Sequence, residues 1–258
     1  MTNTILRSLI AGLALSFAAG AASAVVVTAS NDANTLASAL TGSGITISNA
    51  TLLAASTTGA GTFSSGGNIG FEKGILLTTG NINCAVGPNN NTGCTGAGST
   101  TSLKFDFEST TGNVFFNYVF ASEEYNEYVN TNFNDLFELR LNGVNVALLP
   151  GGAGEVSINN VNNGKNAAFF RDNTGAAGIN TQYDGLTTVL TAQATGLTGK
   201  NTFEFYITDR GDSALDSGVF IQGGTFAAEP SPIPEPASLG LLGLGLIGMV
   251  ASKRRKAA

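Results

Sequence analysis

The sequence contains no histidine and no tryptophan among its 258 residues. Without histidine the chain lacks the commonest general base and cannot form a serine–histidine triad. A catalytic zinc would have to rely on cysteine or carboxylate ligands. The absence of tryptophan also removes the largest ring on which glycan-cleaving enzymes stack their sugars. Because the residue types that most active sites need are missing, we expect the protein not to be an enzyme.

Basic residues are scarce in the part of the chain that we expect to fold. Of the 12 lysines and arginines, Arg7 and the four residues 253–256 lie in terminal segments, which leaves 7 basic residues against the 18 acidic ones up to Glu235, a net charge of −11. No basic patch can form to hold phosphates, so nucleic acid is not expected as a partner. The acidity fits an exported protein and cation binding equally well.

Long apolar runs lie at the two ends of the sequence. Near the N-terminus, Arg7 precedes an apolar run over 9–19, and the small residues Ala-Ser-Ala follow at 22–24. This three-part pattern is typical of a secretory signal peptide over residues 1–24, which signal peptidase removes. We therefore expect export and a mature protein that begins at Val25. A cytoplasmic N-terminal helix is the alternative, and it fits the polar, β-rich sequence that follows less well.

The C-terminal segment, residues 231–258, also has three parts. Pro234-Glu235-Pro236 is followed by an apolar stretch over 237–252 and a basic end over 253–256. A transmembrane helix over the apolar stretch would reach roughly 24 Å, which is short for a hydrocarbon core of ~30 Å. The basic end would remain in the cytoplasm while this helix sits in the inner membrane.

This tail resembles the PEP-CTERM sorting signal of exopolysaccharide-producing Gram-negative bacteria. In that family a proline-glutamate-proline motif precedes a short spanning helix and an arginine-rich end, and Pro234, Glu235 and Pro236 with Arg254 and Arg255 match it without a gap. The resemblance implies cleavage by an exosortase after a transient inner-membrane intermediate. Delivery would be to the cell surface, the outer envelope or the extracellular matrix. An ordinary C-terminal anchor is the alternative.

Two cysteines, Cys84 and Cys94, lie in this exported chain. An even number of cysteines in an oxidising compartment indicates a disulfide. It would close a short loop rich in asparagine and glycine. Metal binding by a cysteine pair without any histidine is a poor alternative. We expect the disulfide to order this loop locally.

Short strand-like segments and turns fill residues 25–230, which we expect to form one domain. Asn31 or Asp32 can cap a short helix at its start. The run Val114–Phe120 combines β-branched and aromatic residues, as in a strand that is buried on both faces. With 34 glycines and 16 phenylalanines, the composition fits an all-β, antiparallel, jelly-roll-like β-sandwich with one short N-terminal helix.

Turn signals predict two hairpins in this sandwich. Thr111-Gly112-Asn113 would join a strand over 103–108 to the strand that begins at Val114. Asn142-Gly143 would join strands over 135–141 and 144–149. We expect residues 59–70, which are rich in glycine and serine, to form a loop.

Acidic residues gather after two of the predicted strands. One group follows the Val114–Phe120 strand, and the other, with Asp209 at its start, occupies the loop 209–217. Carboxylates are the hard oxygen ligands of which calcium takes roughly six to eight, and two that are held close together repel each other without a cation. Calcium is the one cofactor that we expect, and its candidate ligands are Glu123, Glu124, Asp135, Asp212 and Asp216.

Two arrangements without a metal stay open at this point. The carboxylates can simply be solvated loop charges. Neighbouring residues of a strand point to opposite faces, so Glu123 and Glu124 can also diverge, with one of them in a salt bridge to Arg140 or Arg210. Neither acidic loop has the spacing of an EF-hand.

The segment as a whole is similar to the choice-of-anchor L domain, a bacterial exported domain found joined to alternative C-terminal anchors. Matching blocks run in order over roughly residues 30–226, and the most specific reads VFASEEYNEY at Val119–Tyr128. The resemblance implies surface or matrix attachment and no established chemistry.

We therefore expect an exported, non-catalytic surface or exopolysaccharide-matrix protein that acts in adhesion, biofilm or envelope structure. Its expected partners are signal peptidase, an exosortase and exopolysaccharide. A calcium-dependent carbohydrate-binding module is the first alternative. The second is a glycan-cleaving enzyme that uses the Glu123 and Glu124 pair as its two carboxyl groups.

Overall fold

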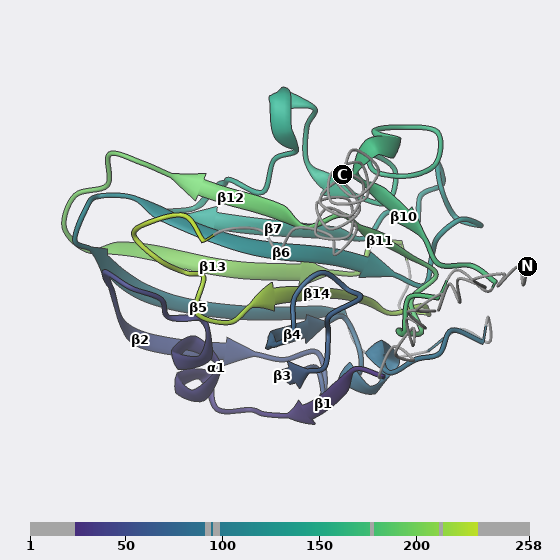
Figure 1. The fold of residues 1–258 in the computed structure, drawn as a ribbon, viewed down its shortest axis with the longest axis horizontal. Coiled ribbons are helices and arrows are strands. Elements are labelled where there is room, and N and C mark those ends of the chain that lie inside the picture. Colours follow the sequence, from purple (N-terminus) through teal and green to yellow (C-terminus); the bar gives the residue numbers. More distant parts are fainter. Residues whose placement is uncertain (1–23, 91–93, 95–98, 176–177, 212–213, 232–258) are drawn as a thin grey trace, which may run out of the picture.

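The computed structural model describes residues 24–90, 94, 99–175, 178–211 and 214–231. They form two sheets that pack face to face, with a single α-helix at one edge (Figure 1). All strand pairings within the sheets are antiparallel. The prediction of an all-β, antiparallel two-layer domain with one short helix is confirmed.

The larger sheet has eight strands. In spatial order they are β1 (Val26–Ala29), β3 (Ala60–Ser64), β4 (Gly74–Thr78), β14 (Ser217–Gln222), β6 (Val114–Ser122), β11 (Gly185–Thr187) and β10 (Phe170–Asp172), with β12 (Leu190–Ala194) also paired to β6. The second sheet has six strands. They are β2 (Ile45–Leu53), β5 (Thr100–Ser109), β13 (Asn201–Thr208), β7 (Leu136–Leu141) and β8 (Val144–Asn145), with β9 (Val156–Ser157) paired to β7.

The α-helix, α1 (Ala33–Leu40), is fixed at its N-terminus by Asp32. The Asp32 carboxylate accepts hydrogen bonds from the Asn34 N–H at 3.0 Å and the Thr35 hydroxyl at 2.6 Å. These bonds satisfy donors that the first helical turn leaves open, and they lower the pKa of Asp32. Leu36, Ala37 and Leu40 are buried, as the spacing predicts. Three short 3-10 helices lie at Ile82–Ala85, Pro150–Gly152 and Ala167–Phe169.

The main core lies between the two sheets and is filled by phenylalanine rings. Phe116 of β6 packs edge-on against Phe203 and Phe205 of β13, with ring centroids 5.3 Å apart in both pairs. Phe226 closes the same cluster against Phe105 and other rings of this layer. Because such rings are fully buried, truncating one to alanine costs ~3–5 kcal/mol.

A second apolar cluster covers the outer face of the eight-stranded sheet. Val119 of β6 belongs to it, together with Leu76, Phe220 and Tyr183, whereas Tyr118 and Phe120 face the main core. Strand β6 is therefore buried on both faces, as its composition predicts. The cluster also includes Cys84, whose disulfide to Cys94 joins two Cα atoms 5.4 Å apart. The predicted disulfide is confirmed in the structure.

The first predicted hairpin is wrong. Strand β5 lies in the six-stranded sheet and β6 in the eight-stranded sheet, so the turn at 110–113 carries the chain from one layer to the other. Both strands have alternating aromatic residues, and Phe107 of β5 and Phe116 of β6 lie in the same core. A turn signal predicts where the chain reverses but not which sheet the next strand joins. Here the two strands bury their aromatic side chains in one core from opposite sheets.

Two further predictions have different outcomes. The hairpin at Asn142-Gly143 is present between β7 and β8, and both turn residues have the positive φ of a type I′ turn. The predicted loop over 59–70 is wrong in part, because β3 occupies its first half. Gly61 lies so close to β1 that a Cβ there would be 2.3 Å from the Thr28 carbonyl oxygen. The glycine that suggested a loop is thus needed for strand pairing.

The domain ends beside the start of β6. Ala227 pairs with Phe115 in an isolated antiparallel bridge, and the Ala228 N–H donates to the Ser43 carbonyl at 2.9 Å. Within the described ranges, no helix has the length and apolar character needed to cross a bilayer. Of the predicted signal peptide (1–24) and sorting tail (231–258), residues 1–23 and 232–258 lie outside the described residues.

Candidate cation site

Strand pairing in the eight-stranded sheet brings two carboxyl groups to one rim of the sandwich. Ser122, the last residue of β6, lies opposite Ser217, the first residue of β14. Glu123 directly follows β6 and Asp216 directly precedes β14, so the two residues are neighbours at this rim. The Glu123 N–H donates a hydrogen bond to the Asp216 carbonyl oxygen at 3.1 Å.

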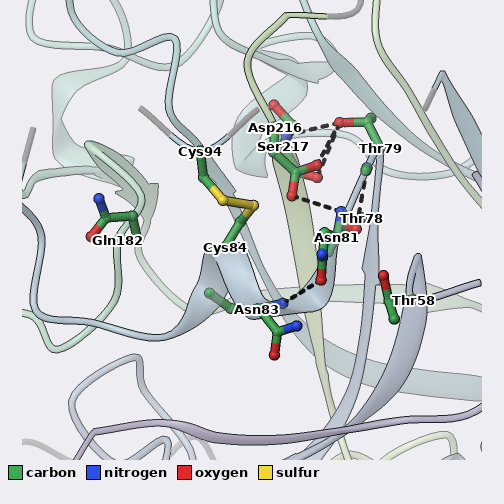
Figure 2. The surroundings of a disulfide bond; sticks show 12 residues. Thr58, Thr78, Thr79, Asn81, Asn83, Cys84, Cys94, Gln182, Asp216 and Ser217 are labelled. Atoms are coloured by element: carbon green, nitrogen blue, oxygen red, sulfur yellow. Dashed lines mark hydrogen bonds between the residues drawn. A yellow bond between two sulfur atoms is a disulfide. The ribbon is translucent and has the colours of Figure 1, made fainter. Parts of the chain in front are cut away.

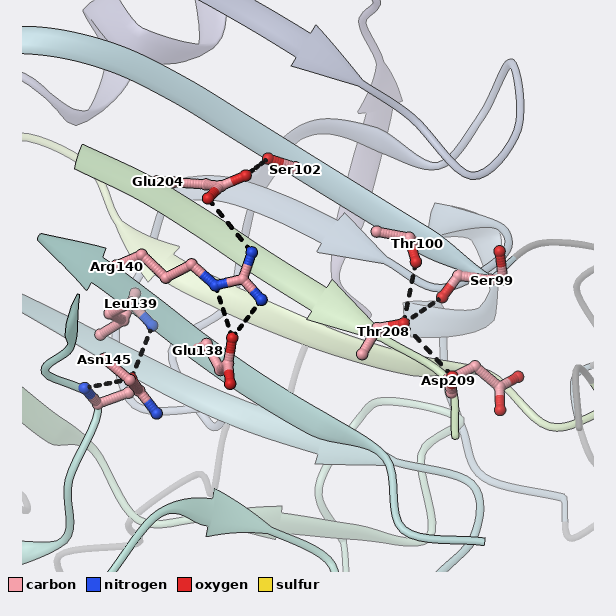
Figure 3. Close-up of polar contacts among 11 residues, drawn as sticks. Ser99, Thr100, Ser102, Glu138, Leu139, Arg140, Asn145, Glu204, Thr208 and Asp209 are labelled. Carbon is pink, nitrogen blue, oxygen red and sulfur yellow. Dashed lines mark hydrogen bonds and ion pairs between the residues drawn. The ribbon is translucent and has the colours of Figure 1, made fainter. Parts of the chain in front are cut away.

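In the six-stranded sheet, two more carboxyl groups lie side by side where β7 begins and β13 ends. Leu136, the first residue of β7, lies opposite Thr208, the last residue of β13. Asp135 and Asp209, the next residues outward, are consequently neighbours. The Asp135 carboxylate accepts the Arg210 N–H at 2.9 Å, and the Asp209 N–H donates to the Ser99 carbonyl at 2.9 Å. Figure 3 shows Asp209 at the end of β13, beside Thr208 and Ser99.

Glu124 joins the two acidic residues of the six-stranded sheet. One carboxylate oxygen from each of Glu124, Asp135 and Asp209 lies within 4.8 Å of the other two. We call these residues the three-carboxylate cluster. Its position is fixed from the β6 side by the Ser122 hydroxyl, which accepts the Glu124 N–H at 3.0 Å. Glu124 and Asp135 are buried, so the charges are held away from bulk water.

Glu123 and Asp216 form a separate group, which we call the buried pair. Glu123 is 2% exposed and Asp216 is 1% exposed. The Asp216 carboxylate accepts hydrogen bonds from the Thr79 hydroxyl at 2.9 Å and the Asn81 N–H at 3.3 Å (Figure 2). By contrast, neither oxygen of the Glu123 carboxylate has a hydrogen-bond partner among the described residues.

Burial makes both members of this pair weaker acids. It raises the pKa of Glu123 to about 9, and the nearby Asp184 and Asp216 carboxylates add to the effect. It raises the pKa of Asp216 to about 7, although the hydrogen bonds from Thr79 and Asn81 act in the opposite direction. The Asp135 carboxylate also raises the pKa of Asp216, so the buried pair and the three-carboxylate cluster influence each other.

One tyrosine hydroxyl, that of Tyr183, lies beside the acidic residues. Tyr183 is completely buried, and burial together with the charges of Asp216 and Glu123 raises the pKa of its phenol far above the ordinary value. Its hydroxyl faces Asp216 but forms no hydrogen bond of normal geometry with any described residue. Tyr125, which follows the two glutamates, is also fully buried, with its ring centroid 4.7 Å from that of Phe170.

The predicted ligands are thus divided between two groups. Glu124 and Asp135 lie in the three-carboxylate cluster, and Glu123 and Asp216 form the buried pair. Asp212 lies outside the described residues. Asp209 is not among the predicted ligands, although it begins the predicted acidic loop 209–217. Nothing in the sequence shows where the hydroxyl of Tyr183 points.

The two arginines considered as salt-bridge partners are used differently. Arg140 pairs with Glu138 and Glu204 on the surface of the six-stranded sheet (Figure 3). It also lies over the Tyr206 ring. Arg210 is exposed and contributes its backbone N–H to Asp135. Among the described residues, no ion pair involves Glu123 or Asp216.

The sequence profile of the choice-of-anchor L domain matches residues 25–227. The chain belongs to the choice-of-anchor L family. This match covers both sheets and both acidic groups. The profile of the PEP-CTERM protein-sorting motif matches residues 232–256 of this choice-of-anchor L protein. Both resemblances noted in the sequence are therefore confirmed. No curated protein and no solved structure matches the chain.

The two matches identify an exported surface protein of a Gram-negative bacterium that is sorted by an exosortase. The sorting residues Pro234, Glu235, Pro236, Arg254 and Arg255 fall within the matched motif but outside the described structure.

Proposed function

We propose that this choice-of-anchor L protein is a non-catalytic, structural or adhesive component of the exopolysaccharide matrix or outer envelope. The spacing of the two family matches carries the proposal. The domain ends at residue 227 and the sorting motif begins at residue 232, so only residues 228–231 separate them. The domain is therefore followed almost directly by the sorting motif, and its surface would provide contacts that hold the protein in the matrix.

The separation of the two glutamates supports a non-catalytic role. A glycoside hydrolase needs two carboxyl groups that flank one glycosidic bond. Glu124 lies with Asp135 and Asp209, whereas Glu123 faces Asp216 and Asp184. Both glutamates are also buried.

The test is to follow the full chain in a producing strain and compare it with the Glu235→Ala variant. We expect the unaltered protein in the extracellular matrix fraction and the variant in the inner membrane, because the exosortase no longer recognises its motif. A strain without the protein should shed more of its exopolysaccharide into the medium. Unaltered matrix retention in that strain would contradict a structural role, and hydrolysis of the polysaccharide by the purified protein would contradict a non-catalytic one.

Calcium-dependent carbohydrate binding is a second candidate function, favoured by the three-carboxylate cluster. Its oxygens come from three separate chain segments and are fixed by strand register, so their repulsion must be offset in the folded state. Calcium accepts such carboxylate ligands. A bound ion at the rim could use its remaining positions for sugar hydroxyls. Glycan-array binding that disappears with a chelator would support this function, and chelator-resistant binding would refute it.

A further inference from the structure

The buried pair poses a different problem from the three-carboxylate cluster. Two acidic residues at adjacent strand ends are both buried, and their carboxyl groups are close enough to influence each other electrostatically. Burying a carboxylate is costly unless a positive charge or hydrogen-bond donors compensate for it. Asp216 has two such donors, but Glu123 has none among the described residues.

The Tyr183 hydroxyl supplies an independent sign that an atom belongs between these side chains. A buried tyrosine hydroxyl ordinarily has a hydrogen-bond partner. Here it is fully buried beside Asp216, with which it has a polar contact that does not reach normal hydrogen-bond geometry. Its position is fixed against β14, since a Cβ on Gly218 would lie only 2.5 Å from the Tyr183 oxygen. The Tyr183 hydroxyl and both Glu123 oxygens are thus buried near Asp216, and none of them makes a hydrogen bond of normal geometry with the described residues.

We propose that Glu123 and Asp216 bind a second cation, calcium, with the Tyr183 hydroxyl as an additional oxygen contact. The inference rests on the calcium binding proposed for the three-carboxylate cluster and extends it to a two-ion arrangement. Glu123 and Glu124, although adjacent in sequence, each serve a different ion. This division explains why a buried strand ends in two consecutive acidic residues.

The neighbouring positions of the two groups give the arrangement a physical consequence. Asp135 of the three-carboxylate cluster acts electrostatically on Asp216 of the buried pair. The carboxylate charge of each group therefore contributes to attracting the ion of the other. The ions also hold the end of the eight-stranded sheet to the edge of the six-stranded sheet, because Glu123 and Glu124 are joined by one peptide bond.

The experiment counts calcium ions on the full chain purified in detergent, by equilibrium dialysis followed by elemental analysis. We expect two ions per chain for the unaltered protein and one for Glu123→Gln. The Glu124→Gln variant should also retain one. Glu108→Gln, which alters an exposed carboxylate on β5, is the matched control and should retain two.

The number of calcium ions bound by each variant distinguishes the site proposed at the three-carboxylate cluster from the site proposed at the buried pair. No bound calcium in the unaltered protein overturns both. One ion that Glu124→Gln removes and Glu123→Gln keeps overturns only the second site. One ion that Glu123→Gln removes and Glu124→Gln keeps supports the buried site and overturns the other. Equal counts in Glu123→Gln and the unaltered protein contradict the present inference in every case.

A second measurement covers the case in which Glu123→Gln does not fold. Terbium replaces calcium at oxygen sites and emits when a nearby tyrosine is excited, and this chain has no tryptophan to interfere. Tyr183→Phe keeps both carboxylates and the buried ring. We expect it to lose a large part of the terbium emission. Emission equal to that of the unaltered protein would overturn the proposed contact with Tyr183.

Discussion

Glu123 and Asp216 are joined by a backbone hydrogen bond of 3.1 Å while their side chains present two acidic groups to the same buried space. The bond follows from the register of β6 and β14, in which Ser122 lies opposite Ser217. Strand pairing therefore holds together two groups that would otherwise repel each other. The stability of this rim should respond to calcium, to pH and to the packing around it.

Calcium should raise the melting temperature of the full chain. An ion that binds only the folded state adds ~2.7 kcal/mol to the free energy of unfolding at a hundredfold excess over its dissociation constant. Asp209→Asn should reduce the calcium-dependent shift, whereas Glu108→Gln should leave it unchanged. The measurement is a thermal melt with millimolar calcium and with chelator at matched ionic strength. Identical melts in the two conditions would exclude a structural calcium site.

In chelator, the protein should become less stable as the pH rises. A carboxyl group with a raised pKa binds its proton more tightly in the folded state, so its contribution is complete below the unfolded-state pKa of ~4 and is lost as the pH passes the folded-state value. Those values are about 7 for Asp216 and about 9 for Glu123. The free energy of unfolding should fall by roughly a few kcal/mol between about pH 5 and pH 9.

The Glu123→Gln variant provides the control for this pH dependence. It removes the titrating group with the higher pKa, so the loss of stability above roughly pH 7 should be smaller than in the unaltered protein. Denaturant unfolding at a series of pH values measures the effect. A free energy of unfolding that increases steadily from pH 5 to pH 9 in chelator would contradict the burial of these two groups.

Local patterns in the sequence predicted much of this fold, and long-range pairing decided the rest. The cap at Asp32, the turn at Asn142-Gly143 and the double burial of β6 each depend on a few neighbouring residues. The pairing of β5 was predicted incorrectly, because a turn such as 110–113 does not encode which sheet the next strand joins.

The candidate site shows the same limit. Strand-end acidity in the sequence drew attention to the stretch after β6 and to the loop before β14. The partition of Glu123 from Glu124 depends on two registers, Ser122 with Ser217 and Leu136 with Thr208, that no single segment contains. For this reason the sequence offered one ligand set where the structure has two groups.

The disulfide should stabilise both the fold and the buried pair. The Cys94 carbonyl accepts the Asp216 N–H at 3.1 Å, so the bridge to Cys84 positions the segment that carries Asp216. A double Cys84→Ser and Cys94→Ser variant should lose roughly 2–3 kcal/mol of unfolding free energy, since the closed loop is short. Its calcium-dependent melting shift should also decrease. Labelling of two free thiols in the denatured, unreduced protein would contradict the bridge.

Gly218→Ala should destabilise the protein through Tyr183. The new methyl group would lie 2.5 Å from the Tyr183 oxygen and 2.9 Å from the ring carbon that carries it. Overpacking of this kind costs ~1–3 kcal/mol. Gly164→Ala, whose methyl group would meet only the Asn162 side-chain oxygen at 3.5 Å, is the control.

Adding Tyr183→Phe to Gly218→Ala should recover part of the lost stability, because it removes the clashing oxygen. Thermal melts of the single and double variants measure this. If the double variant loses as much stability as the two single variants lose together, the clash does not involve the Tyr183 oxygen.

The bridge between Ala227 and Phe115 places the C-terminal end of the domain near the start of β6. The chain leaves the sandwich beside the start of β6, and the acidic rim lies beyond its last residue, Ser122. Seven residues of extended strand separate these two points, roughly 23 Å at ~3.3 Å per residue. A protein held by its C-terminal end would therefore present the acidic rim on the side away from that attachment.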